Sequence, residues 1–187
     1  MSVSSAVPHT SSSDHYSAVA VTLHWLIALL IVANVVIGIA FKYHVTGAFP
    51  LHQSIGLTVL GLSVLRVIWR LGHPWPPLPT AMPGWEKALA IFTFVAFYFL
   101  ILAIPLLGWA AVSAHARGTP EWFGAAVPKL PVAQDHETGE QLGNLHMVLA
   151  WGAVVLVALH VAGAIKNSYF QKNHELTRMI PGLKTPD

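Results

Sequence analysis

The chain has 187 residues, of which 55% are hydrophobic and only 10% are charged, and its formal net charge is +2. A soluble domain carries roughly a quarter charged residues, so this chain has too few to cover a water-facing surface. Disorder is excluded too, because disordered chains are polar and rich in charge. The mild charge gives no sign of a nucleic-acid partner. With no cysteine, disulfides, thiolate metal sites and covalent c-type haem attachment are excluded.

Four long apolar segments follow a Ser-rich tail of residues 1–18, and they predict membrane spans at about 19–41, 51–70, 88–112 and 145–165. A helix needs about 20 apolar residues to cross the hydrocarbon layer. Lipid offers the backbone no water partner, so the spans should be helices. We therefore predict an all-α fold, an integral membrane four-helix bundle in which residues 19–187 form one domain.

The placement of Lys and Arg predicts the direction of the spans. With the N-terminus inside, the cytoplasmic side receives Arg66, Arg70, Lys87, Lys166, Lys172, Arg178 and Lys184, and the outer side receives Lys42, Arg117 and Lys129. This asymmetry favours both termini in the cytoplasm. The connection 113–144 then lies outside, where Trp122 and Phe123 suggest a loop or a short helix on the membrane interface.

Four of the 11 histidines fall inside the predicted spans: His24, His52, His146 and His160. An ionisable side chain in a membrane is a functional hypothesis by default. His146 and His160 are 14 residues apart, which is close to four helical turns, so they share one helix face at a separation of roughly 21 Å. By depth, His24 pairs with His160 on the cytoplasmic side and His52 pairs with His146 on the outer side.

Two imidazoles that face each other across a helix bundle indicate a six-coordinate haem iron. Zinc would usually take four ligands, and no carboxylate or thiolate accompanies either pair. The sequence therefore predicts two haem groups at opposite depths, although interhelical hydrogen bonding is the alternative role for each histidine. Arg66 and Arg70 are candidates to neutralise haem propionates, and their alternative role is to reach the lipid headgroups.

The remaining histidines are interpreted as solvated. His9 and His15 lie in the tail, and His44, His73, His115, His136 and His174 lie in connections or the C-terminal segment. His136 and Glu137 are adjacent, but nothing at ligand spacing supports a metal site there.

Several motifs give the chain a resemblance to the bacterial cytochrome b561 family. They are Leu23-His24-Trp25, Leu51-His52-Gln53-Ser54-Ile55-Gly56, Arg66-Val67-Ile68-Trp69-Arg70-Leu71, Arg117-Gly118-Thr119-Pro120-Glu121-Trp122-Phe123-Gly124 and the spacing of His146 and His160. The resemblance covers about residues 15–181. It implies a multi-pass protein of the bacterial inner membrane, with two haem b groups held by His24, His160, His52 and His146, and with ubiquinone as electron acceptor.

One activity of this family is the oxidation of superoxide on the outer side with reduction of ubiquinone. A small anionic donor would be attracted by Lys42, Arg117 and Lys129, but Glu121, Asp135, Glu137 and Glu140 lie on the same side. Two other hypotheses remain open. The chain could be a membrane anchor and electron conduit for a redox partner protein such as a hydrogenase or formate dehydrogenase, or a non-redox scaffold whose histidines only form hydrogen bonds.

Overall fold

The computed structural model describes residues 17–73, 83–116 and 118–170. Its helices are α1 (Ala18–Lys42), α2 (Ala48–Gly72), α3 (Gly84–Ala114) and α4 (His136–Phe170), and all four are long and apolar enough to cross a membrane. A short antiparallel hairpin of β1 (Glu121–Trp122) and β2 (Ala125–Ala126) precedes α4. The predicted helical membrane fold is confirmed. The tail 1–16, most of the Pro-rich 73–79 loop, Arg117 and the segment after residue 170 lie outside the described residues.

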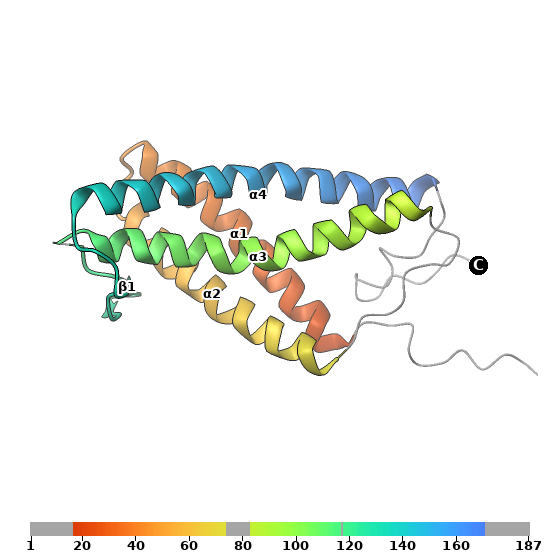
Figure 1. Ribbon diagram of the computed structural model, residues 1–187, viewed down its shortest axis with the longest axis horizontal. Coiled ribbons are helices and arrows are strands. Elements are labelled where there is room, and N and C mark those ends of the chain that lie inside the picture. The colour runs from red at the N-terminus through yellow and green to blue at the C-terminus, as the bar shows by residue number, and fades with distance from the viewer. Residues whose placement is uncertain (1–16, 74–82, 117, 171–187) are drawn as a thin grey trace, which may run out of the picture.

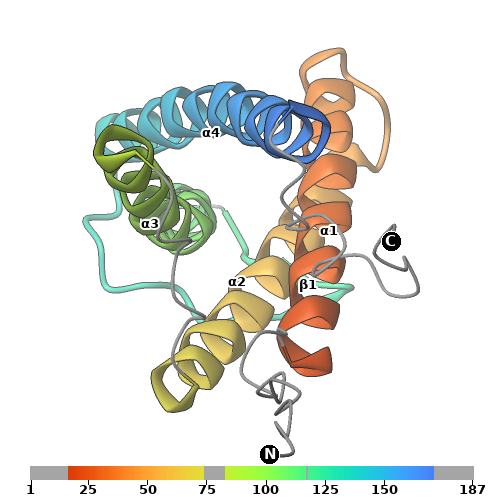
Figure 2. The ribbon, with the colours of Figure 1, turned by 90° about the vertical axis from the view of Figure 1, so that its right-hand side faces the viewer.

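The helices associate as two pairs. α1 packs on α2, α3 packs on α4, and α2 joins the pairs by packing on α3. Figure 1 shows the pairs close together at the end that carries β1 and diverging toward the other end, and the view along the bundle agrees (Figure 2). Within the described residues, α1 and α4 make at most marginal backbone contact. A group bound between α1 and α4 would therefore be held by side chains.

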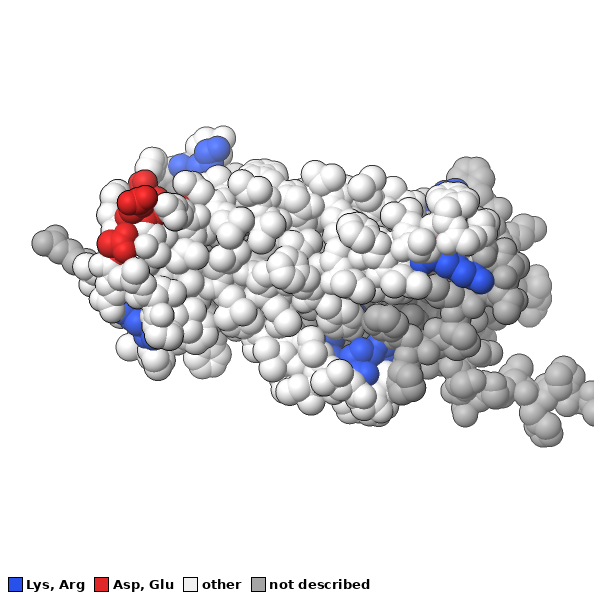
Figure 3. Space-filling view, in the orientation of Figure 1, with Lys and Arg blue, Asp and Glu red and all other residues white. Residues whose placement is uncertain are grey.

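The outer surface of the helices is that of a membrane protein. Large apolar side chains point outward along every helix, including Leu29, Val32, Phe92, Val148 and Leu159, each at least 59% exposed in the isolated chain. Small polar residues are buried instead, because Ser54, Ser63 and Ser113 are at most 2% exposed. Small residues let helices approach closely in lipid. Figure 3 shows charged side chains at the two ends of the molecule and an uncharged band between them.

Local caps set where the helices begin. The Ser17 hydroxyl accepts a hydrogen bond from Ala20 N and caps α1. Asp135 accepts hydrogen bonds from both the backbone N and the hydroxyl of Thr138, each at 2.8 Å, and these bonds hold the Asp135 pKa below its usual range. This cap starts α4 at His136. The helix is thus longer than the predicted span, because its first turns lie outside the apolar band.

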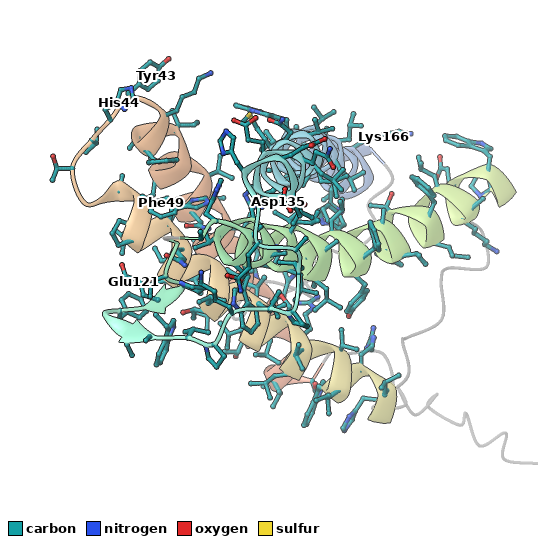
Figure 4. All side chains as sticks on the ribbon, turned by 60° about the vertical axis from the view of Figure 1, so that its left-hand side comes forward. Tyr43, His44, Phe49, Glu121, Asp135 and Lys166 are labelled. Atoms are coloured by element: carbon teal, nitrogen blue, oxygen red, sulfur yellow. The ribbon has the colours of Figure 1, made fainter. Side chains whose placement is uncertain are left out.

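The outer connection forms a hairpin that packs on α2, where the sequence suggested a loop or a short helix. Trp122 Nε1 donates to Thr58 Oγ1 at 3.0 Å, and Phe123 N donates to Ser54 Oγ at 2.9 Å. The turn needs positive φ at Phe123 (46°) and Gly124 (84°), which a helix would not allow. Figure 4 shows Glu121 of the hairpin and Asp135 before α4 at the same end of the molecule.

Candidate functional site

The structure brings His52 of α2 and His146 of α4 together near the outer end of the bundle. Their ring centroids are 6.0 Å apart, and the ring planes are inclined at 84°. Both side chains are partly buried. This is the outer pair that the depth argument predicts, although 94 residues separate its members in the sequence.

Hydrogen bonds fix the orientation of both outer imidazoles. His52 Nδ1 lies 3.0 Å from Asn34 O, and His146 Nδ1 lies 2.8 Å from Ile104 O. A backbone carbonyl can only accept, so Nδ1 carries the proton and donates it in each ring. Nε2 is left as the nitrogen with a free lone pair, as a metal-binding histidine requires. Two helices outside the pair, α1 and α3, supply these carbonyls.

Two glycines allow the outer imidazoles to lie close to the neighbouring helices. A Cβ on Gly38 of α1 would lie 2.9 Å from His52 Cε1, and a Cβ on Gly108 of α3 would lie 3.1 Å from His146 Nδ1. Real side chains do not approach so closely without displacing a neighbour. Sequence reasoning missed both positions. The available signal was a glycine inside a long apolar helix, where a close approach is the usual reason for its presence.

The inner pair joins α1 to α4. His24 is close enough to His160 and to Arg66 to interact electrostatically with both. The His160 ring packs edge-on against Phe97 of α3, with centroids 5.2 Å apart. His24 and His160 are thus within electrostatic range of each other, and their pairing around one haem stays a prediction.

The two candidate arginines of α2 occupy different environments. Arg66 Cζ lies 5.9 Å from the centroid of the Tyr98 ring and is near His24. Arg70, one turn further along, donates from Nη1 to His73 O at 3.2 Å. It also lines a pocket of about 440 Å³ between α2 and α3, whose other walls are Val67, Leu71, Val95, Tyr98, Phe99 and Leu102. Arg66 thus lies within electrostatic range of His24 of the inner pair.

The candidate steering cations lie around the outer end. Lys42 is the last residue of α1 and is exposed. Lys129 Nζ donates to His115 O at 3.0 Å and to Ala116 O at 3.2 Å, which ties the connection to the end of α3. Arg117 is outside the described residues. Acidic side chains gather at the same end (Figure 3), so the structure does not give this end a clear positive excess.

The donor set fits haem better than a bare metal ion. An imidazole nitrogen lies about 2 Å from a bound first-row metal such as zinc, and a centroid separation of 6.0 Å is compatible with one metal between the two rings. Within the described residues, no group of three or more His, Cys, Asp or Glu side chains could hold a metal. Lipid offers no water to complete a coordination shell. Haem iron would already be bound by the four nitrogens of the porphyrin, so two imidazoles from the chain would be enough to hold it.

Comparisons with known proteins agree with this chemistry. The family model described as "Prokaryotic cytochrome b561" matches residues 15–182. The chain is 30% identical over 180 residues to "Cytochrome b561 homolog 2" of Escherichia coli (strain K12), covering 91% of this chain and 94% of that protein. It is 27% identical over 172 residues to "Probable superoxide oxidase CybB" of Yersinia pestis, covering 89% and 96%. It is 28% identical over 182 residues to "Cytochrome b561 homolog 1" of Escherichia coli (strain K12), covering 91% and 99%.

A match over most of the chain and four apolar helices of spanning length together settle the class of protein. The chain belongs to the prokaryotic cytochrome b561 family, whose members are multi-pass inner-membrane proteins that bind haem b and transfer electrons.

Proposed function

We propose that this protein carries two haem b groups and passes electrons from superoxide at its outer face to ubiquinone in the membrane. The observation that supports it most is the outer histidine pair. His52 and His146 face each other at 6.0 Å, and both have Nδ1 committed to a carbonyl. These two bonds join helices, as bonds of structural histidines do, but they use Nδ1 alone and leave Nε2 of both rings for a ligand.

The protein's own residues hold and orient the two groups. His52 and His146 would bind the outer haem, and His24 and His160 would bind the inner one. Haem would supply one-electron redox chemistry when bound, and two histidines holding each iron would leave no position for oxygen. The site is then suited to electron transfer and not to oxygen binding. Arg66, beside His24 and over Tyr98, would neutralise a propionate of the inner haem, and Arg70 is the second candidate for that role.

Superoxide as the donor is supported by the sequence similarity to the Yersinia pestis protein named "Probable superoxide oxidase CybB". Superoxide is a small anion that gives up one electron without any bond being made by the protein. The chain would contribute placement of the outer haem and a local field from Lys42, Arg117 and Lys129. Lys129 is held by two carbonyls, so its charge has a fixed position on the outer face.

Ubiquinone as the acceptor is supported by the pocket between α2 and α3. Its walls are almost wholly apolar and its volume is about 440 Å³, which is within the usual range for small-molecule sites. Tyr98 contributes to the pocket and also lies beneath Arg66, which in turn is near His24. A quinone ring in this pocket would therefore approach the inner haem from the lipid.

The direction follows from charge at the two ends. Among the described residues, the end that carries the start of α1 has the cations Arg66, Arg70, Lys87 and Lys166 and the single anion Glu86. The end with the hairpin has Lys42 and Lys129 against Glu121, Asp135, Glu137 and Glu140. Cationic ends stay in the cytoplasm, so the outer haem would face the periplasm.

The test is stopped-flow spectroscopy of the haem-loaded protein mixed with superoxide, with and without ubiquinone-1. The proposal expects fast reduction of the haem absorbance and reoxidation that depends on quinone. Haem reduction no faster than the spontaneous loss of superoxide would reject superoxide as the donor. It would favour the electron conduit for a partner enzyme, for which co-purification of a metalloenzyme subunit is the direct evidence. Purified protein without haem b bands would reject both redox functions.

A further inference from the structure

A third histidine pair, His115 and His136, lies at the ends of the connection between α3 and α4, outside the candidate haem ligands. His115 directly follows α3, and His136 is the first residue of α4. Their ring centroids are 5.9 Å apart and the planes are inclined at 42°. The connection between the two helices thus brings together histidines that are 21 residues apart in the sequence.

The His115 ring is seated on the first turn of α4. A Cβ on Gly139 would lie 2.7 Å from His115 Cε1 and 3.0 Å from each ring nitrogen. The edge of the ring that carries both nitrogens therefore faces α4, and only glycine at position 139 allows the approach. Lys129 Nζ holds the same segment through His115 O at 3.0 Å. The position of His115 is fixed from both sides.

A carboxylate completes the cluster. Glu140 follows His136 by one helical turn, and Glu140 Oε1 lies 3.3 Å from His136 Nε2. Residues at this spacing share one helix face. The His136 and Glu140 side chains are 78% and 62% exposed, so water molecules can reach both. Two imidazoles and one carboxylate are ligand types shared by zinc and copper sites in proteins.

We propose that His115, His136 and Glu140 form an outer-surface binding site for one divalent transition metal ion, Zn²⁺ or Cu²⁺. The three side chains do not yet converge, because no group of three in the described residues could hold a metal as placed. The two imidazoles bind first, the exposed Glu140 side chain then turns from His136 to the ion, and water fills the remaining positions. At the membrane-embedded pairs no such water is available, which separates this site from them.

The surroundings favour a cation of this class. Asp135 and Glu137 flank His136 in the sequence and, with Glu140, add negative charge that outnumbers the one nearby cation of the described residues, Lys129, which is bonded to His115 O. Imidazole selects Zn²⁺, Cu²⁺ and Ni²⁺ over Mg²⁺ and Ca²⁺, which prefer oxygen ligands. The sequence analysis found no metal site at His136, because His115 reaches it only through the fold, from the end of α3.

The test is calorimetric titration of Zn²⁺ into the full-length, haem-loaded protein in detergent, with His44→Ala as the matched control. His44 is also an exposed outer histidine, and Figure 4 shows it on the α1–α2 turn, away from Asp135 at the start of α4. The proposal expects one ion whose Kd rises at least about tenfold in His115→Ala and in His136→Ala, as losing even a supporting group at a metal site does. Glu140→Gln should weaken binding less, and His44→Ala should leave Kd unchanged.

A second measurement separates ligand loss from unfolding. Gly139→Ala keeps every ligand but displaces the His115 ring, so it should weaken Zn²⁺ binding while the haem spectrum stays that of the unaltered protein. With Cu²⁺, electron paramagnetic resonance should show nitrogen coupling that is reduced in His115→Ala. A Kd for Zn²⁺ that His115→Ala and His136→Ala leave unchanged, in protein with a normal haem spectrum, would overturn the proposal.

Discussion

At the scale of single residues, the outer histidines differ from ordinary core histidines in how their nitrogens are used. In His52 and His146, Nδ1 is bonded to a main-chain carbonyl of a third or fourth helix, and Nε2 is kept for another partner. The ring position is then determined by helices that contribute no ligand. This arrangement explains why α1 and α3 carry a glycine at each contact with the outer pair.

The two pairs should be separable by mutation. His52→Ala and His146→Ala should each remove the outer haem, and His24→Ala and His160→Ala the inner one, because one lost axial ligand leaves a haem with a single bond to the protein. Low-temperature absorbance spectra of the four variants measure this. Loss of the same spectral component in His24→Ala and His52→Ala would contradict the pairing.

Gly38→Ala should disturb the outer haem alone. The new methyl group would meet His52 Cε1 at 2.9 Å, so the ring must move away from its Asn34 hydrogen bond. We expect a shifted midpoint potential for the outer haem and an unchanged inner one, measured by redox titration. Gly61→Ala is the matched control, since nothing lies within 4 Å of a Cβ there. Equal effects of the two variants would show that the close approach has no role.

At the scale of elements, the β1–β2 hairpin ties the connection between α3 and α4 to α2, the helix that carries His52. Its bonds use Ser54 and Thr58, which lie on α2 within two turns of that histidine. Trp122 and Phe123 remain 48% and 61% exposed, as expected of aromatic residues at the membrane interface. The hairpin therefore braces α2 and presents two aromatic side chains at this end of the molecule.

Ser54→Ala should loosen this bracing. Ser54 is 2% exposed and its hydroxyl accepts from Phe123 N, and loss of one such hydrogen bond costs about 0.5–1.5 kcal/mol. We expect a lower thermal midpoint in detergent and faster proteolysis within residues 118–135. Thr93→Val is the control, because the Thr93 hydroxyl only donates to Leu89 O within its own helix. A midpoint lowered no more than in that control would count against the hairpin's role.

Much of the element level could be predicted from sequence. Four spans, their order and the depths of His24, His52, His146 and His160 follow from apolar length and helical rise. The hairpin could not be predicted, since its two-residue strands carry no periodicity and are fixed by contacts with α2. Gly38 and Gly108 were missed for a similar reason: their meaning depends on which helix lies opposite. Arg66 was a candidate from its charge, but its place beside His24 and Tyr98 depends on helix packing.

At the scale of the whole molecule, the charges define an electrical polarity along the bundle. One end is cationic and the other carries most of the described acidic residues, with an uncharged band between them (Figure 3). His52 and His146 lie toward the hairpin end, and His24 lies within electrostatic range of Arg66 toward the cationic end. Under the proposed function, electrons would pass between these two differently charged ends.

Electrostatic attraction of superoxide by the outer cations can be tested by varying the salt concentration. The field of Lys42, Arg117 and Lys129 is screened with a Debye length of about 8 Å at physiological ionic strength. The rate of haem reduction by superoxide should therefore fall as salt rises, and fall further in Lys129→Glu and Arg117→Glu. Stopped-flow rates at several salt concentrations measure it. A rate that neither salt nor charge reversal changes would remove the steering argument.

The central claim is that one chain holds two haem b groups between four intramembrane histidines. The pyridine haemochrome assay, normalised to protein mass from amino-acid analysis, tests it most directly. The account predicts two non-covalently bound haem b groups per fully loaded chain, and one per chain in His52→Ala. A ratio of one haem per chain in the fully loaded, unaltered protein would contradict it.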